Sequence, residues 1–131
     1  MRFFILLLAL LPATAYASDL TFISDASNPG NGKKYKAYID QSTIHREGVY
    51  QTVKLVSIYE NPISAAGFAG VKSMVNTFQI DCLRHVQRVT YIGFLDTQER
   101  VIVEEKYPNE ANEPFGSDTV GNQIAPYLCS K

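Results

Sequence analysis

The stretch VKSMVNTFQIDCLRHVQRVTYIGFL, residues 71–95, decides the fold of this chain. Its first half alternates, with Phe78 and Ile80 on one side and polar residues on the other, as in a strand with one buried face. Its second half is rich in β-branched and aromatic residues on both sides, which favours a central strand. We therefore expect two strands, Val71–Asp81 and His85–Leu95, joined by a short turn.

The N-terminus has the features of a secretory signal peptide. Met1-Arg2 precedes the apolar run Phe3–Leu11, and Ala15-Tyr16-Ala17 is a cleavage-site pattern. The run is shorter than the ~20 apolar residues that a membrane-spanning helix needs, and no later stretch reaches that length. We expect cleavage of residues 1–17 and a periplasmic or secreted protein. No cysteine lies near the cleavage point, so no lipid anchor is expected.

The remaining residues, 18–131, have a length typical of one domain. The chain has 12 Lys and Arg against 13 Asp and Glu, so neither sign dominates, which argues against nucleic acid as an electrostatic partner. The two histidines, His45 and His85, lie in no metal-binding or catalytic motif. We expect no cofactor, no metal and no catalytic residue.

The chain has two cysteines, Cys82 between the two strands and Cys129 near the C-terminus. An exported protein meets an oxidising compartment, where such a pair favours a disulfide over a metal site or a nucleophile. The bond would hold the C-terminal segment against the middle of the sheet.

Further strand signals alternate with turn formers along the chain. Four more strands are expected, at Leu20–Ser24, Lys34–Asp40, Val49–Glu60 and Arg100–Lys106. Ser42–Gly48 and Tyr107–Gly116 are polar and expected to be irregular, and Asn61-Pro62 is expected to end the third strand.

A helix is expected near the C-terminus. Val120, Ile124 and Leu128 form a helical stripe, and Ser117 is a suitable N-cap. Pro126 removes a backbone donor and clashes with the preceding turn, so the helix is expected to kink or end early. The predicted fold is α+β: a six-stranded antiparallel sheet with a C-terminal helix packed on it and tied by the disulfide.

Two groups of residues are candidates for binding a protein. The small-residue segment Ile63–Gly70 is expected to be a loop, in which Ile63 and Phe68 either face a partner or fold back onto the core. Arg84 and Arg88 share one face of a strand and either form a basic patch for an acidic partner or are scattered surface charges.

The order of several motifs resembles the bacterial surface-adhesin protein E family. The motifs are an aromatic strand around Phe22, the segment YIDQSTI at residues 38–44, the Asp81-Cys82 pair ending a strand, an Arg-rich strand after it, and Cys129. The resemblance implies a six-stranded sheet with a helix fixed by the disulfide. It also implies an adhesin that binds host extracellular proteins and plasminogen.

The sequence therefore predicts an exported, non-enzymatic protein-binding domain. An open sheet also offers an edge to a second copy, which would give a homodimer. The alternative function is a small periplasmic inhibitor or immunity-type protein that inserts the Ile63–Gly70 loop into an enzyme.

Overall fold

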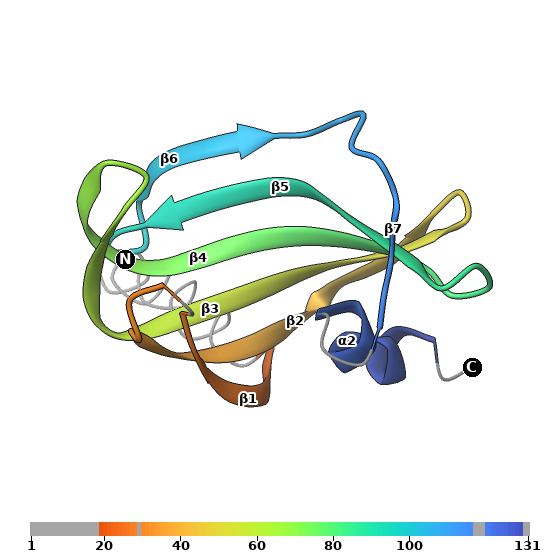
Figure 1. Cartoon of the computed structure of the whole chain (residues 1–131), viewed down its shortest axis with the longest axis horizontal. Coiled ribbons are helices and arrows are strands. Elements are labelled where there is room, and N and C mark those ends of the chain that lie inside the picture. Colours follow the sequence, from red (N-terminus) through yellow and green to blue (C-terminus); the bar gives the residue numbers. More distant parts are fainter. Residues whose placement is uncertain (1–18, 29, 117–119, 130–131) are drawn as a thin grey trace, which may run out of the picture.

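The computed structural model describes residues 19–28, 30–116 and 120–129 of the chain. The predicted signal peptide, residues 1–17, and the predicted N-cap Ser117 lie outside the described residues. The structure is one curved antiparallel sheet with a helix at one end of it (Figure 1). The elements are β1 (Leu20–Ser27), β2 (Lys34–Glu47), β3 (Tyr50–Ala65), β4 (Phe68–Asp81), β5 (Val86–Leu95), β6 (Val101–Lys106), β7 (Glu113–Pro114) and α2 (Val120–Leu128).

Strands β1 to β6 follow one another across the sheet in chain order, so each pairs with its neighbour in sequence. This confirms the predicted six-stranded antiparallel sheet with a C-terminal helix. One short strand was not expected: β7, in the connection predicted to be irregular, pairs with the start of β5. No helix in the described part of the chain is long and apolar enough to cross a membrane.

Four strands are longer than the sequence predicted, and β1 and β4 each gain three residues, at the end of β1 and at the start of β4. β2 continues through the segment expected to be a turn, because its pairing with β3 resumes at His45 after an irregularity that follows Asp40. β3 continues past Pro62, which was expected to end it. The pairing of β3 with β4 is irregular between Ile58 and Ile63, so Pro62 lies where no regular ladder donor is required.

The prediction of a loop at Ile63–Gly70 was wrong. β3 and β4 pair almost to their ends, with Ile63 opposite Val71 and Ala65 opposite Phe68. Ala66 and Gly67 form the turn, with φ of 53° and 80°. Positive φ at both central positions is the geometry that matches the twist of a two-residue hairpin.

The helix also differs from expectation, because α2 continues through Pro126 to Leu128. The backbone N–H of Cys129 donates to the carbonyl of Ala125 over 2.7 Å, so the last turn is closed behind the proline. The disulfide between Cys82 and Cys129 is confirmed, with a Cα–Cα distance of 5.7 Å. Tertiary contacts therefore hold a helix end that local sequence disfavours.

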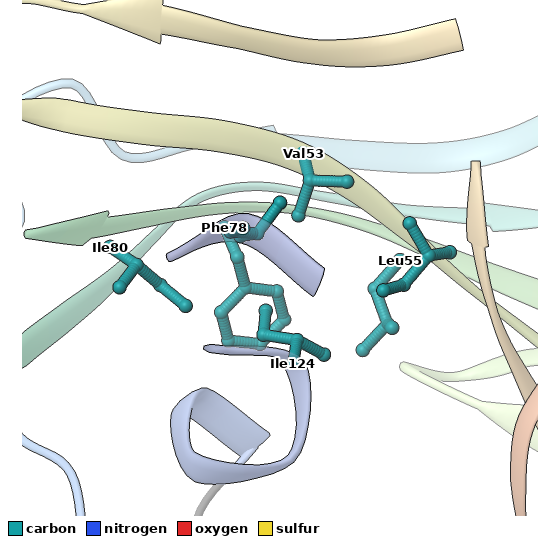
Figure 2. Packing of buried hydrophobic residues seen from close by; sticks show 7 residues of the cluster. Val53, Leu55, Phe78, Ile80 and Ile124 are labelled. Atoms are coloured by element: carbon teal, nitrogen blue, oxygen red, sulfur yellow. The ribbon is translucent and has the colours of Figure 1, made fainter. Parts of the chain in front are cut away.

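The main core lies between α2 and the sheet (Figure 2). Ile124 and Leu128 of the helix contact buried residues of three strands. These strand residues are Ile39, Val53, Leu55, Phe78 and Ile80. A second cluster contains Tyr59, Ile63 and Val71, with Tyr35 and Phe94 packed against it. Ile63 is only 7% exposed, so of the two roles left open by the sequence it has the core role.

Candidate functional site

Two turns lie side by side at the end of the sheet that α2 also occupies (Figure 1). The pairing of Gln51 with Ile80 brings the turn between β2 and β3 next to the turn between β4 and β5. We call the surface that these turns form the arginine tip. It consists of Val49, Tyr50, Leu83, Arg84 and Arg88.

Asp81 shapes the turn that carries Leu83 and Arg84. Its Oδ1 accepts the backbone N–H groups of Leu83 and Arg84 at 3.1 and 3.2 Å, and its Oδ2 accepts Arg84 Nε at 2.6 Å. The Arg84 side chain and these backbone donors stabilise the carboxylate and hold the pKa of Asp81 below its ordinary value. A buried carboxylate thus fixes an exposed arginine.

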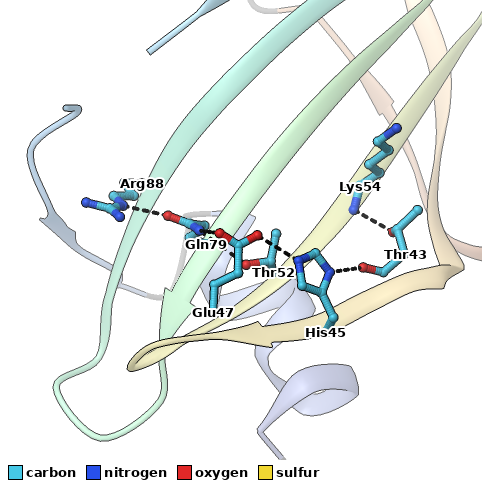
Figure 3. Close-up of polar contacts among 7 residues, drawn as sticks. All are labelled: Thr43, His45, Glu47, Thr52, Lys54, Gln79 and Arg88. Atoms are coloured by element: carbon cyan, nitrogen blue, oxygen red, sulfur yellow. Dashed lines mark hydrogen bonds and ion pairs between the residues drawn. The ribbon is translucent and has the colours of Figure 1, made fainter. Parts of the chain in front are cut away.

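Arg88 is fixed by different contacts. Its guanidinium carbon lies 4.1 Å from the centre of the Tyr50 ring, a cation–π arrangement. Its Nε donates to Gln79 Oε1 over 2.8 Å, and Gln79 Nε2 in turn donates to Thr52 Oγ1 over 3.2 Å and to Glu47 Oε2 over 3.4 Å (Figure 3). Gln79 is buried, so its hydrogen bond holds the Arg88 side chain in one orientation on the sheet.

The network continues to the edge of the arginine tip through His45 (Figure 3). His45 Nδ1 lies 2.8 Å from the Thr43 carbonyl oxygen, and Nε2 lies 2.6 Å from Glu47 Oε1. Both partners are acceptors, so the doubly protonated imidazolium satisfies both contacts. The Thr43 carbonyl first, and Glu47 second, raise the pKa of His45 above its ordinary value.

Apolar side chains are exposed beside these ordered groups. Leu83 is 92% exposed and Val49 is 57% exposed. Tyr and Arg are enriched among the residues that dominate protein interfaces, and exposed apolar groups gain most from being covered. The arginine tip therefore has the chemistry of a protein-binding surface, with positive charge and apolar area together.

The comparisons with known proteins agree with this kind of function. The family model of surface-adhesin protein E matches residues 25–130. The chain belongs to the surface-adhesin protein E family. No curated protein and no solved structure matches the chain. Membership supports a surface-adhesin role in general, with a protein partner and export from the cell, and the disulfide fits a location outside the cytoplasm.

The structure separates the residues that the sequence singled out in this adhesin domain. Arg84 and Arg88 come together, and both lie near Tyr50. Ile63 and Phe68 lie at the other end of the sheet, where Phe68 is 44% exposed and Ile63 is buried. Within the described residues, no group of three or more His, Cys, Asp or Glu could hold a metal ion.

Sequence reasoning missed three residues of the arginine tip. From the sequence, Val49 and Tyr50 are only the expected start of a strand. The contact between Tyr50 and Arg88 is tertiary, so no local pattern predicts it. Leu83 had a signal that could have been used: it is an apolar residue in a turn of four residues between two strands. Such a residue has no strand face on which to be buried.

Proposed function

We propose that this adhesin domain acts without enzymatic activity, by binding a host extracellular protein through the arginine tip. The observation that carries the proposal is Leu83, almost fully exposed between groups that are held in place. Arg84 is fixed by Asp81, and Arg88 by Tyr50 and Gln79. Pre-ordered arginines lose little side-chain entropy on binding, which favours affinity.

The charge of the arginine tip indicates the chemistry of the partner. Arg84 is already paired with Asp81, so the guanidinium group of Arg88 and the exposed Leu83 are left for a partner. An acidic segment with an apolar residue in it would complement them. We further propose that removal of residues 1–17 leaves residues 18–131 as one domain, in the periplasm or secreted, without a lipid anchor. Mass spectrometry of the mature N-terminus tests this.

The binding proposal is tested with two matched variants. Leu83→Glu places a negative charge on the arginine tip, and Phe68→Glu places the same charge on an exposed aromatic position at the other end of the sheet. Binding to immobilised plasminogen and to a basement-membrane extract is measured by biolayer interferometry. We expect Leu83→Glu to weaken binding at least about tenfold, the size of a typical interface hot spot, and Phe68→Glu to leave it unchanged.

Equal binding by wild type and Leu83→Glu would refute the role of the arginine tip. If neither host preparation is bound, the adhesion proposal itself fails. Circular dichroism of both variants is the control for folding, and both substitutions are at exposed positions.

The inhibitor hypothesis loses its structural basis but has a direct test. It required Ile63–Gly70 to enter an active site as a loop, whereas Ile63 is buried and the segment is the end of a β-hairpin with a two-residue turn at Ala66 and Gly67. A pull-down from the periplasm of the producing cell tests it. Capture of one enzyme together with loss of its activity would favour the inhibitor function over adhesion.

A homodimer remains a further proposal. β1 and β6 each pair with one neighbour within the sheet, so their outer edges offer backbone groups to a second copy. A monomeric mass by sedimentation at high micromolar concentration would refute it.

A further inference from the structure

A polar row crosses the sheet from the edge of the arginine tip to Arg88. His45 of β2 pairs with Thr52 of β3. Thr52 in turn pairs with Gln79 of β4, which pairs with Arg88 of β5. Side chains of directly paired residues lie on the same face of a sheet. A titratable imidazole and a guanidinium group of the binding surface therefore lie at the two ends of one row.

Glu47 connects the two ends of this row (Figure 3). Its Oε1 lies 2.6 Å from His45 Nε2, and its Oε2 accepts Gln79 Nε2 over 3.4 Å. The other end of the same Gln79 amide accepts Arg88 Nε over 2.8 Å. Glu47 and Arg88 thus bind the two ends of one amide group. Their charges interact at this separation, because salt at physiological concentration screens charges over roughly 8 Å.

The contacts of His45 are satisfied only while its ring is doubly protonated. Nδ1 lies 2.8 Å from the Thr43 carbonyl oxygen, and Nε2 faces the carboxylate of Glu47. A neutral imidazole has one N–H, so deprotonation places a ring lone pair against one of these acceptors. The same two contacts raise the pKa of His45 above its ordinary value of 6.5. The contact with Glu47 is therefore complete at mildly acidic pH and is lost as the pH rises through the folded-state pKa.

Glu47 is the group whose charge favours the protonated form of His45. The charged side chains that β3, β4 and β5 present on this face beside the row are Lys54, Asp81 and Arg88. The two basic groups favour the neutral form of His45, and Asp81 is already paired with Arg84. β1 pairs with β2 only as far as Asp40, and α2 packs against the opposite face of the sheet.

We propose that His45 makes the arginine tip sensitive to pH, because its protonated ring neutralises Glu47 and leaves the charge of Arg88 to an acidic partner. When the ring loses its proton, Glu47 loses this counter-charge. The negative charge of Glu47 then offsets the positive charge of Arg88 across the shared amide. The tip binds an acidic partner more tightly at mildly acidic pH than at mildly alkaline pH.

This inference rests on the arginine tip as the binding surface of the proposed function. The coupling between His45 and Arg88 is a property of the chain alone, so it can be measured without a partner. Failure of the coupling and failure of adhesion are therefore distinguishable.

The first experiment follows the coupling by NMR in the exported protein. The ring signals of His45, the side-chain amide of Gln79 and Nε of Arg88 are recorded from about pH 5.5 to 8.5, on both sides of the ordinary histidine value. We expect the Gln79 and Arg88 signals to shift with the same midpoint as His45. His45→Gln has no charge to lose in this range, so both shifts should be absent.

His85→Asn is the matched control. It removes the other histidine, which is exposed in the turn between β4 and β5 and lies outside the row. Asn readily adopts the φ of 55° at this position, so the turn is retained. The shifts of Gln79 and Arg88 should remain in this variant.

The second experiment measures binding to immobilised plasminogen and to the basement-membrane extract by biolayer interferometry. Variants are compared at one pH at a time, so that titration of the partner cancels. At about pH 5.5, His45→Gln should bind about two- to fivefold more weakly than wild type, the effect of one exposed charge pair. At about pH 8.5, where the wild-type ring is neutral, the two should bind equally.

Glu47→Gln gives the opposite result at the alkaline pH. It removes the negative charge that offsets Arg88, so at about pH 8.5 it should bind about two- to fivefold more tightly than wild type. The side chains of His45 and Glu47 are 54% and 56% exposed, so both substitutions should leave the fold intact. Circular dichroism checks this.

Two results would overturn the proposal. The first is that the Gln79 and Arg88 signals of wild type do not follow His45, a result that needs neither a variant nor a partner. The second is an equal loss of affinity at both pH values in His45→Gln, which would mean that His45 contacts the partner directly. A shared midpoint without binding to either host preparation would refute adhesion and leave the coupling established.

Discussion

The two ends of the sheet are stabilised in different ways. At the arginine tip, a disulfide, a helix, a buried carboxylate and a hydrogen-bond network hold the turns, and Leu83 is left exposed. At the other end, an apolar cluster that includes Ile63 and a two-residue turn at Ala66 and Gly67 hold the hairpin. The end with the disulfide and the polar network leaves Leu83 exposed, whereas the apolar cluster at the other end buries Ile63 and leaves Phe68 at the hairpin tip partly exposed.

The largest effect is expected at the apolar end. Ile63→Ala should lower the free energy of unfolding by about 2–5 kcal/mol, because it leaves a cavity in the second cluster. Phe68→Ala, five residues further along the same hairpin, should lower it by less, because Phe68 is 44% exposed and is not among the buried residues of the cluster. Urea denaturation measures both. Similar losses for the two variants would contradict the assignment of Ile63 to the core.

Breaking the disulfide should affect the arginine tip. Cys129→Ser is expected to lower stability by about 2–4 kcal/mol, because the unfolded chain loses a cross-link between positions 47 residues apart. Hydrogen exchange should show the first loss of protection in α2 and in the turn at Leu83. Protection around Ile63 should fall only with global unfolding. An unchanged denaturation midpoint would show that the disulfide does not stabilise the protein. Loss of protection that begins at the Ala66 turn would show that the disulfide does not act at the arginine tip.

A smaller, pH-dependent effect is expected for Asp81→Asn. The folded-state pKa of Asp81 lies below its ordinary value of 3.8, so its stabilising contribution is complete above about pH 4. That contribution is lost as the pH falls through the folded-state pKa. The variant should therefore be less stable than wild type at neutral pH, and the difference should shrink in acid.

Asp96 provides the matched control for this pH dependence. Its pKa is also lowered, first by the backbone N–H of Arg100, but it lies at the opposite end of β5 from the arginine tip. Asp96→Asn should leave hydrogen-exchange protection at Leu83 and Arg84 unchanged, whereas Asp81→Asn should lower it. The same acid-unfolding curve for wild type and Asp81→Asn would rule out the role of this carboxylate.

The smallest effect is expected at the tight turn of the apolar end. Ala66 has a φ of 53°, a backbone conformation that Asn adopts more readily than Ala. Ala66→Asn should raise stability by about 0.5–1 kcal/mol, measured by thermal unfolding. A loss of stability would show that the turn does not have the hairpin geometry described here.

Local patterns were sufficient to predict the strands, the helix and the disulfide. Alternation in the 71–81 stretch predicted that Phe78 and Ile80 pack in the core, which is confirmed. The prediction that the other face of β4 is exposed was wrong, because Ser73, Gln79 and Asp81 on that face are buried too. The direction of each side chain was predictable, because in a strand it depends only on the two-residue repeat. The cysteine pair was predictable because export makes a disulfide the favoured state of two thiols.

Element lengths and the candidate sites were not predictable in this way. Pro62 and Pro126 each act locally as breakers, yet β3 and α2 continue past them because an irregular pairing and a closed last turn compensate. The arginine tip depends on Tyr50 and Arg88 meeting across strands.

By itself, the sequence determined the alternation of the strands, the helical stripe and the cysteine pair, because each of these depends on neighbours in the chain. The tertiary structure alone decided that Ile63 is buried, since the sequence left open whether it faces a partner or the core. The physical reason is that burial depends on what the rest of the fold places over a side chain. Ile63 lies in the cluster with Tyr59 and Val71, whereas Leu83 lies in a turn at the end of the sheet.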